Sequence, residues 1–290
     1  MKVVVASGKG GTGKTLVATS LALVAQELGQ AVLLDADVEA PNAALFLRPE
    51  IERRYAVERW VPAVDERLCT HCGRCAEVCQ YHAIAALPQK TLVFDELCHG
   101  CGSCALNCPI GAIQEQPKAL GWIESGHANG LAFAQGILQV GEAMATPVIR
   151  ALKRHALEMG WDQNRWLVLD APPGTACPVI EALRGADVAL LVTEPTPFGL
   201  HDLQLAVQVA RDALHLPIAV VLNKEGAGDR AVEAYCAQEG LPILLRIPLE
   251  REIAIAYSNG RPLVDALPTY RPGFTALLDL LLGLAGGSSS

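Results

Sequence analysis

Aromatic residues are scarce in this chain of 290 residues, at 5% of the total, although hydrophobic residues make up 51%. A core with so few aromatic rings has to be aliphatic, which is typical of a buried parallel sheet rich in Val, Ile and Leu. Charged residues amount to only 19%, and this composition excludes a disordered chain and a coiled coil. The length fits about two domains, or one large α/β domain with an insertion.

The chain also lacks an excess of positive charge and long hydrophobic runs. The formal net charge is −8, which disfavours general binding to nucleic acid or to an anionic membrane, so neither partner is expected. The apolar run that follows Met1 ends at Ala6, which is too short for the core of a signal peptide. The apolar stretch 276–285 contains Asp279 and is shorter than the roughly 20 residues of a spanning helix. The sequence therefore predicts a cytoplasmic protein.

The ten cysteines are concentrated in one segment. Eight of them lie between Cys69 and Cys108, and only Cys177 and Cys236 lie elsewhere. Because no export signal is expected, disulfides are disfavoured and metal binding is favoured. Of the two remaining residues, Cys177 is predicted to be a packed thiol and Cys236 a buried helix residue.

The clustered cysteines form two motifs with the spacing C-x2-C-x2-C-x3-C. This is the spacing of bacterial ferredoxins, in which the fourth cysteine ligates the cluster of the other motif. Three thiolates on a tight loop can cover three iron atoms, whereas the fourth has begun a helix and points away. The spacing predicts two [4Fe–4S] clusters, the first bound by Cys69, Cys72, Cys75 and Cys108 and the second by Cys98, Cys101, Cys104 and Cys79.

Zinc is the alternative metal for clustered cysteines. Zinc sites use paired C-x2-C knuckles with four ligands for each ion, and the third cysteine of each motif has no role in such a knuckle. Two short strands are expected at residues 83–87 and 91–94, separated by Pro88-Gln89. With the two cysteine motifs, they make residues 60–118 resemble a two-cluster bacterial ferredoxin.

A glycine-rich loop follows the short β-rich run Lys2–Ala6. Strand, loop and helix in this order are the context that a Walker A motif requires. The loop and helix N-terminus offer backbone N–H groups to the phosphates of ATP or ADP, Lys14 is expected to reach the β- and γ-phosphates, and Thr15 is expected to ligate Mg²⁺. The loop reads Gly8-Lys9-Gly10-Gly11-Thr12-Gly13-Lys14-Thr15.

Lys9 makes this loop resemble the deviant Walker A motif of the MinD/ParA/Mrp family of P-loop ATPases. In that family the extra lysine reaches across a dimer to the nucleotide of the partner. The resemblance therefore implies that Lys9 is catalytic together with Lys14. It also implies an ATP-dependent homodimer, or a heterodimer with a paralogue, whose hydrolysis of ATP is slow and depends on dimerisation.

Further segments resemble the same family. The apolar run 31–37 ends in two carboxylates and resembles switch I, in which Asp35 would lie near Mg²⁺ and Asp37 would position the attacking water. Asn42 follows at the usual offset of the family and is expected to contact the nucleotide. Asp170 ends the apolar run 167–170. It resembles the Walker B aspartate of the family, which would bind Mg²⁺ through water.

The resemblance extends to the base of the nucleotide. Asn223, which ends the apolar run 218–223, resembles the family residue that reads adenine. Pro248 lies in a segment that resembles the loop closing over the base. The other residues expected to bind the nucleotide are Gly8, Gly10, Gly11, Thr12 and Gly13.

Strands that alternate with helical stretches predict a doubly wound, mostly parallel α/β sheet. The expected fold is a P-loop NTPase of the SIMIBI or MinD type with a small inserted α+β ferredoxin-like domain. We expect the ATPase domain in residues 1–56 and 119–284, the ferredoxin domain in 57–118 and a flexible tail in 285–290. Cationic residues at helical spacing, Arg150, Lys153, Arg154 and His155, are expected to form a solvated face.

These motifs predict an ATPase whose nucleotide switch is coupled to two [4Fe–4S] clusters. Its role would be electron delivery to a partner metalloprotein, or maturation of that partner. An Mrp-like iron–sulfur carrier is the alternative, although such carriers use a C-terminal C-P-x-C pair that this sequence lacks. A MinD-like positioning ATPase is the third possibility, but it would want a basic amphipathic C-terminal helix, and residues 270–285 hold one basic residue, Arg271.

Overall fold

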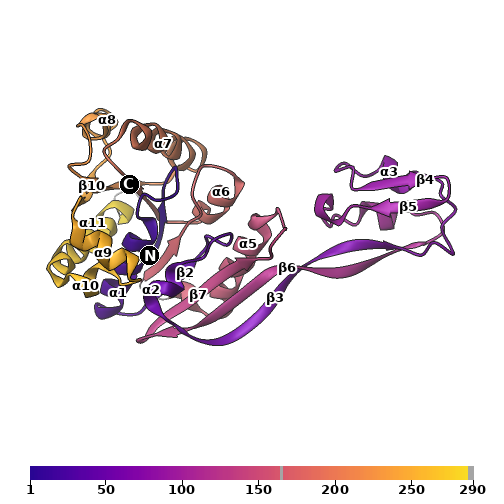
Figure 1. Ribbon diagram of the computed structural model, residues 1–290, viewed down its shortest axis with the longest axis horizontal. Coiled ribbons are helices and arrows are strands. Elements are labelled where there is room, and N and C mark those ends of the chain that lie inside the picture. The colour runs from indigo at the N-terminus through magenta and orange to yellow at the C-terminus, as the bar shows by residue number, and fades with distance from the viewer. Residues whose placement is uncertain (164–165, 287–290) are drawn as a thin grey trace. The chain divides into compact units, whose positions relative to one another are not determined.

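The computed structural model describes residues 1–163 and 166–286 and divides into two compact units, each of which is treated by itself (Figure 1). Unit 1 comprises Met1–Tyr55, Ile123–Ile137 and Ala145–Ser290. Unit 2 comprises Ala56–Trp122 and Leu138–Met144. Unit 2 contains both cysteine motifs, and unit 1 contains the glycine-rich loop.

The helices and strands have the following bounds. The strands are β1 Lys2–Ala6, β2 Ala31–Asp35, β3 Glu50–Val64, β4 Ile84–Leu87, β5 Lys90–Val93, β6 Ile113–Ala128, β7 Leu131–Leu138, β8 Trp166–Asp170, β9 Val188–Thr193, β10 Ile218–Glu225 and β11 Ile243–Pro248. The α-helices are α1 Lys14–Glu27, α2 Ala43–Leu47, α3 Arg74–Glu77, α4 Ser103–Leu106, α5 Ala145–Glu158, α6 Cys177–Leu183, α7 Pro197–Val207, α8 Ala231–Gln238, α9 Arg251–Ser258, α10 Leu263–Ala266 and α11 Arg271–Gly286. The 3₁₀ helices are η1 Asp95–Leu97, η2 Trp161–Gln163 and η4 Pro268–Tyr270, and η3 Gln208–Ala213 is a π-helix.

The main sheet joins nine strands of the described residues in the order β11-β10-β9-β1-β8-β2-β7-β6-β3. The strands from β11 to β7 pair in parallel. Helices α1, α10 and α11 pack on one face, and α5, α6 and α7 cover the other (Figure 1). The predicted doubly wound, mostly parallel α/β sheet is thereby confirmed.

The core of unit 1 is aliphatic, as the composition predicts. One of its clusters includes the inner side of α1 and is dominated by Val, Leu, Ile and Ala, with Phe133, Trp166 and Phe274 as its fully buried rings. Alternate residues of β1 point to opposite faces: Val3 and Val5 join this cluster, and Val4 faces the other layer. Each fully buried side chain of this size contributes about 1.5–3 kcal/mol to stability.

Strands β3 and β6 each contribute residues to both units, and their length is not predicted by the sequence pattern. A tight turn closes β6 onto β7, because Asn129 and Gly130 take positive φ values of 50° and 83°. Asn-Gly at these two positions is typical of a type I′ hairpin turn. This turn therefore places β6 directly beside β7, the last strand of the parallel part of the sheet.

Unit 2 holds a small hairpin and two short helices around the cysteine motifs. Strands β4 and β5 pair antiparallel, with Ile84 opposite Val93, which confirms the two predicted strands of this segment. Helices α3 and α4 begin directly after Gly73 and Gly102, whose φ values are positive. The buried hydrophobic clusters of unit 2 are small, and cysteine side chains are prominent members of them.

Several smaller predictions have mixed outcomes. Cys236 is buried in α8, as predicted, but Cys177 is exposed at the start of α6, so the prediction of a packed thiol is wrong. The prediction of a solvated face on α5 is also wrong at His155, which is 4% exposed and packs against Tyr55 and Trp161.

The C-terminal segment contains the last helix of unit 1. Helix α11 extends through Gly286, and residues 287–290 of the predicted tail lie outside the described residues. Within the part of the chain that the structure describes, no helix combines the length and apolar character needed to cross a bilayer.

Candidate nucleotide site and cysteine clusters

The glycine-rich loop lies between β1 and α1, at the carboxyl edge of the parallel sheet. Gly13 has a φ of 95°, and a Cβ atom there would lie 2.3 Å from Nδ2 of Asn223. That amide in turn donates a hydrogen bond of 2.7 Å to the carbonyl oxygen of Thr12. Only glycine fits at this position, and the end of β10 is thereby tied to the loop predicted to hold phosphates.

Two aspartates end neighbouring strands at this edge. Asp35 and Asp170 lie opposite each other in the β2–β8 register, and both are fully buried. Asp35 accepts hydrogen bonds from the backbone N–H groups of Asp37, Asn42 and Ala43 at 3.1, 2.9 and 2.9 Å. Burial and the nearby Asp170 charge raise the pKa of Asp35, and burial raises the pKa of Asp170 to about 7.

These buried oxygens suit a divalent cation. The Thr15 hydroxyl donates a hydrogen bond of 2.6 Å to one carboxylate oxygen of Asp170. The other Asp170 oxygen, together with Oδ1 of Asn42 and Oγ1 of Thr12, is buried without a hydrogen-bond partner among the described residues. Hydroxyl, amide and carboxylate oxygens are the donors that Mg²⁺ accepts, usually with several waters retained. The residues present therefore fit a magnesium ion.

Asp37 and Lys14 face the same region. Burial raises the pKa of Asp37, while the positive charge of Lys14 opposes that rise. Lys14 is itself only 7% exposed, so its ammonium lies within a poorly solvated site among the aspartates. A carboxylate whose proton affinity is increased in this way is suited to accept a hydrogen bond from water.

The residues predicted to contact the base line one cavity with the loop. This cavity encloses about 700 Å³, open solvent included, between the glycine-rich loop, the end of β10 and α9. Asn223 and Pro248 line it together with Gly11 and Gly13, and Tyr257 adds an aromatic wall. Its volume and largely apolar walls are those of a small-molecule site.

Lys9 forms an ion pair with Glu194, at the end of β9 in the same chain. Glu194 also accepts from Lys224, at 2.9 Å, and Lys224 donates to the carbonyl oxygen of Gly11, at 3.0 Å. Burial disfavours ionisation of Glu194, but the two lysines outweigh it, and the pKa of this carboxyl lies below its ordinary value. Glu194 therefore holds the loop lysine within its own protomer.

In unit 2, the two predicted cysteine sets line two separate cavities. One cavity of about 360 Å³, open solvent included, is lined by all four cysteines of the second set, Cys79, Cys98, Cys101 and Cys104. The other, of about 340 Å³, is lined by all four of the first set, Cys69, Cys72, Cys75 and Cys108. In each set, the cysteine from the distant motif lies with the three from the near one.

Backbone amides around these cavities point at sulfur. Gly100 donates to Sγ of Cys98 at 3.4 Å, Ala83 donates to Sγ of Cys79 at 3.3 Å, and the N–H of residue 112 donates to Sγ of Cys108 at 3.2 Å. Such donors favour the thiolate form that a metal requires. Gly100 has a φ of 64°, and a Cβ there would lie 2.8 Å from the carbonyl oxygen of Trp60, which only glycine avoids.

Burial works against ionisation of the inner thiols in the absence of a cation. It raises the pKa of Cys104 to about 11 and also raises that of Cys75. A cationic metal reverses this balance, because the thiolate is the form that coordinates it. The chemistry of the donor set and the amide contacts to sulfur fit iron–sulfur clusters.

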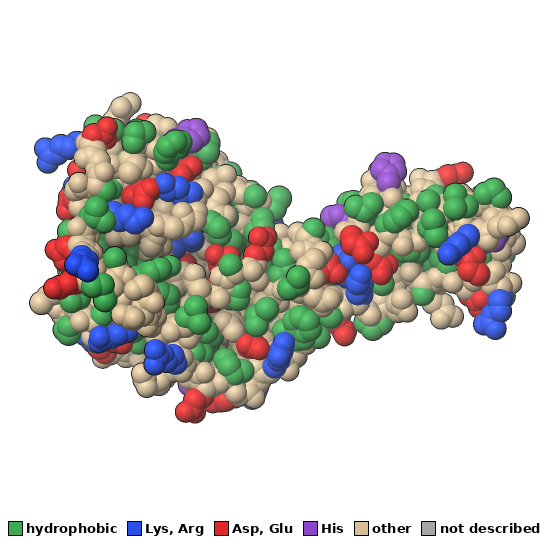
Figure 2. Space-filling model, viewed as in Figure 1, with side chains coloured by type: hydrophobic (Ala, Val, Ile, Leu, Met, Phe, Trp, Pro, Cys, Tyr) green, Lys and Arg blue, Asp and Glu red, His purple; other side chains and the backbone are tan. Residues whose placement is uncertain are grey.

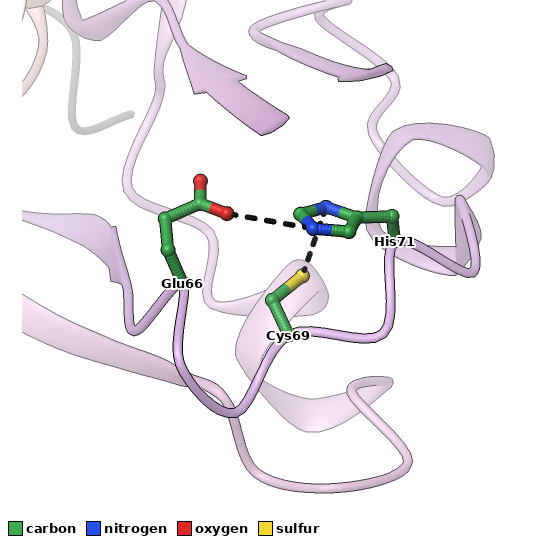
Figure 3. A group of neighbouring side chains, drawn as sticks. All are labelled: Glu66, Cys69 and His71. Atoms are coloured by element: carbon green, nitrogen blue, oxygen red, sulfur yellow. Dashed lines mark hydrogen bonds and ion pairs between the residues drawn. The ribbon is translucent and has the colours of Figure 1, made fainter. Parts of the chain in front are cut away.

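His71 lies beside the first set of cysteines. Its Nδ1 is 3.7 Å from Sγ of Cys69, and its Nε2 is 3.8 Å from a carboxylate oxygen of Glu66 (Figure 3). Each of the three side chains offers one ligand atom within 4.8 Å of the others. Because Cys69 already lines the first cavity, this group belongs to the predicted cluster site.

Comparison with known proteins bears on these sites. Residues 3–263 match the family described as the CobQ/CobB/MinD/ParA nucleotide binding domain. The chain belongs to this family. Its nucleotide site is therefore that of a MinD/ParA-type P-loop ATPase, and nucleotide and Mg²⁺ fit it.

Individual relatives extend the comparison. An uncharacterized protein of Methanocaldococcus jannaschii is 34% identical, with 78% of this chain and 79% of the relative covered. The iron-sulfur cluster carrier protein of Pyrococcus abyssi is 26% identical, with 91% and 79% covered. The fold is similar to that of the cell division ATPase MinD of Pyrococcus furiosus, with a TM-score of 0.57, 20% identity and 96% and 98% of the two chains covered.

Two residues of the nucleotide site, Glu194 and Lys224, are not among those predicted from the sequence. Glu194 follows β9 in the sequence Val-Thr-Glu-Pro, so a carboxylate at the end of a buried strand was the available signal. Lys224 follows Asn223 directly, but its contact with Gly11 joins positions more than two hundred residues apart in sequence. Local sequence patterns carry no information about such a contact.

Proposed function

We propose that this protein is an ATPase that binds two [4Fe–4S] clusters and serves iron–sulfur metabolism. The observation that carries the proposal is the grouping of eight cysteines into two four-cysteine cavities within a member of the MinD/ParA-type ATPase family. Clusters held in this way supply one-electron redox chemistry. The residues of the chain bind the clusters, donate amide hydrogen bonds to sulfur and exclude solvent from the inner thiolates.

In the nucleotide site, Lys14 and the loop amides would hold the phosphates, and Thr15, Asp35 and Asp170 would hold Mg²⁺ directly or through water. Asp37 would orient the attacking water. Because Lys9 is paired with Glu194 within one protomer, its proposed transfer to the nucleotide of a partner requires that this ion pair be broken. Hydrolysis would then be slow and dependent on dimerisation.

Two roles are consistent with this chemistry. Relatives named as iron–sulfur cluster carrier and assembly proteins favour a carrier that passes a cluster to recipient proteins. The burial of Cys75, Cys98 and Cys104 favours resident clusters that pass electrons instead. The surface of unit 2 suits a protein partner in either role, because it exposes many large hydrophobic side chains (Figure 2). They include Trp60, Leu68, Tyr81, Phe94, Leu97, Leu106 and Ile110.

The decisive experiment counts iron and follows its fate. Anaerobically prepared protein should hold about eight iron atoms and eight sulfides per chain, from the two-cluster ligand count. One zinc per motif would overturn the cluster proposal. The ⁵⁵Fe-labelled protein is then mixed with an apo-ferredoxin acceptor, with and without ATP, and transfer of ⁵⁵Fe identifies a carrier. In a parallel sample the clusters are first reduced with dithionite and the excess is removed; reoxidation by an acceptor dye with full retention of iron identifies an electron donor.

Lys9→Ala tests the proposed dimeric mechanism. The variant should retain much of its ATP binding and lose turnover. The reason is that the negative charge developing on the γ-phosphate would lack a positive charge to stabilise it. Lys90→Ala is the control, because it removes an exposed lysine of β5 in unit 2; it should keep the wild-type rate. A wild-type rate in Lys9→Ala would show that Lys9 is not catalytic.

A further inference from the structure

A second cavity in unit 1 lies away from the nucleotide site. It encloses about 650 Å³, open solvent included, between the sheet and the C-terminal ends of α5 and α6. Its floor is apolar and includes Val4, Leu34 and Leu169. Lys2, at the amino end of β1, lies at its edge, whereas the glycine-rich loop follows the carboxyl end of the same strand.

The rim of this cavity is positively charged. Lys2, Lys153 and Arg184 line it, against a single lining carboxylate, Asp162. Among residues 1–163 and 166–286, no carboxylate lies within ion-pair distance of Nζ of Lys2 or Lys153, and Arg184 has only Glu181, at 3.8 Å.

Other charged groups nearby are already paired. Glu181 is engaged by Arg150 at 3.0 Å, and Asp187 accepts from the backbone N–H of Lys2 at 2.7 Å. The lining side chains therefore leave an excess of positive charge at the rim.

The C-terminal end of α6 fixes the position of the Lys153 ammonium. Its ammonium donates to the carbonyl oxygens of Glu181 and Arg184, both at 2.6 Å. An ammonium has three donors, so one N–H remains after these two bonds. Burial lowers the pKa of Lys153. The Glu181 carboxylate opposes this change, and the positive charges of Lys2, Arg184 and Arg150 add to it. An anion at the rim would relieve this repulsion.

From this arrangement we infer a binding site for a small organic acid with an apolar body, separate from the nucleotide site. Its carboxylate lies among Lys2, Lys153 and Arg184, and its hydrocarbon part lies on the aliphatic floor. The combination of few polar groups and an apolar surface is typical of small-molecule sites. Charge pairing in this half-enclosed position orients the acid, and burial of its hydrocarbon surface supplies most of the affinity.

The test uses 2-naphthoate as the probe, with 2-naphthalenemethanol as its uncharged counterpart, in equilibrium dialysis against the full-length protein. We expect naphthoate to bind at least tenfold more tightly than the alcohol, and saturating ATP to leave its binding unchanged. Lys153→Met and Arg184→Gln should each weaken binding about fivefold or more, which corresponds to ~1 kcal/mol.

Arg154→Gln is the matched control, because it removes the same charge from an exposed position of α5 that does not line the cavity; it should change the affinity less than twofold. Arg184→Gln keeps the test valid if Lys153→Met unfolds the C-terminal end of α6. The inference is overturned by equal binding of acid and alcohol, by displacement of naphthoate with ATP, by an equal effect of Arg154→Gln, or by no binding at all.

Discussion

Units 1 and 2 bury different kinds of residue. The core of unit 1 is a large aliphatic cluster that surrounds α1 and includes fully buried residues such as Leu21 and Leu33. The two clusters in unit 2 are small, and Cys75, Cys98 and Cys104 are among their buried members. A unit that buries so little hydrocarbon gains less stability from its own packing. We infer that unit 1 is stabilised by packing and that unit 2 depends on what its cysteines bind.

Removal of iron should therefore have the largest effect, and it should be confined to unit 2. Metal binding and folding are coupled where the ligands form much of the core. Anaerobic chelation followed by hydrogen–deuterium exchange should show loss of protection across residues 69–108, while β1 and β8 keep theirs. Equal protection of both regions before and after chelation would mean that unit 2 is stable without its clusters.

Lys14→Ala tests whether the nucleotide site can be damaged without loss of the clusters in unit 2. The affinity for ATP should fall by about 100-fold, or ~2.7 kcal/mol, because the charge closest to the phosphates is lost. Iron content should remain at the wild-type value. Calorimetric titration with ATP and iron analysis of the same sample measure both quantities, and a loss of iron in this variant would contradict the separation of the two units.

Cys108→Ser should have a smaller effect, restricted to one cluster. Cys108 lines the first cavity although it belongs to the second motif, so the variant should lose the first cluster and keep the second. About half of the iron should remain, and the spectrum of the reduced protein should show a single cluster. Cys236→Ser, which changes a buried thiol of unit 1, is the control and should leave all of the iron in place.

Much of the site was predictable because it depends on local sequence. Asp35 and Asp170 end short apolar runs, and the ends of parallel strands meet at one edge of the sheet. Long-range contacts were not predictable: Glu194 binds Lys9 across 185 positions.

The missed part of the fold has a different cause. Strand β3 begins with residues 50–54, which are mostly charged and all exposed. This segment therefore lacks the alternation of apolar and polar residues that indicates a strand. His155 was wrongly placed on a solvated face because its neighbours along α5 are cationic, whereas its own ring packs between Tyr55 and Trp161.

The smallest effect is expected from an acid-sensitive contact in unit 1. The hydrogen bond from Arg150 lowers the pKa of Glu181 below 4.5. A depressed carboxyl pKa contributes stability above the unfolded pKa, and that contribution is lost as the pH falls through the folded pKa.

Glu181→Gln should therefore cost less than about 1 kcal/mol near neutral pH. The difference from wild type should shrink below about pH 4, in urea denaturation followed by circular dichroism. A difference that grows on acidification would show that this carboxylate destabilises the fold.

The strand order has a consequence for the order of synthesis. Strand β1 pairs with β8 and β9, and β2 pairs with β7 and β8, so the earliest strands to leave the ribosome wait for partners that follow residue 130. All eight clustered cysteines emerge before any of those partners. Because domains fold as units during translation, the cysteine loops are complete while the centre of the sheet is still unpaired. Loading of metal into the nascent chain therefore does not have to await a finished nucleotide site.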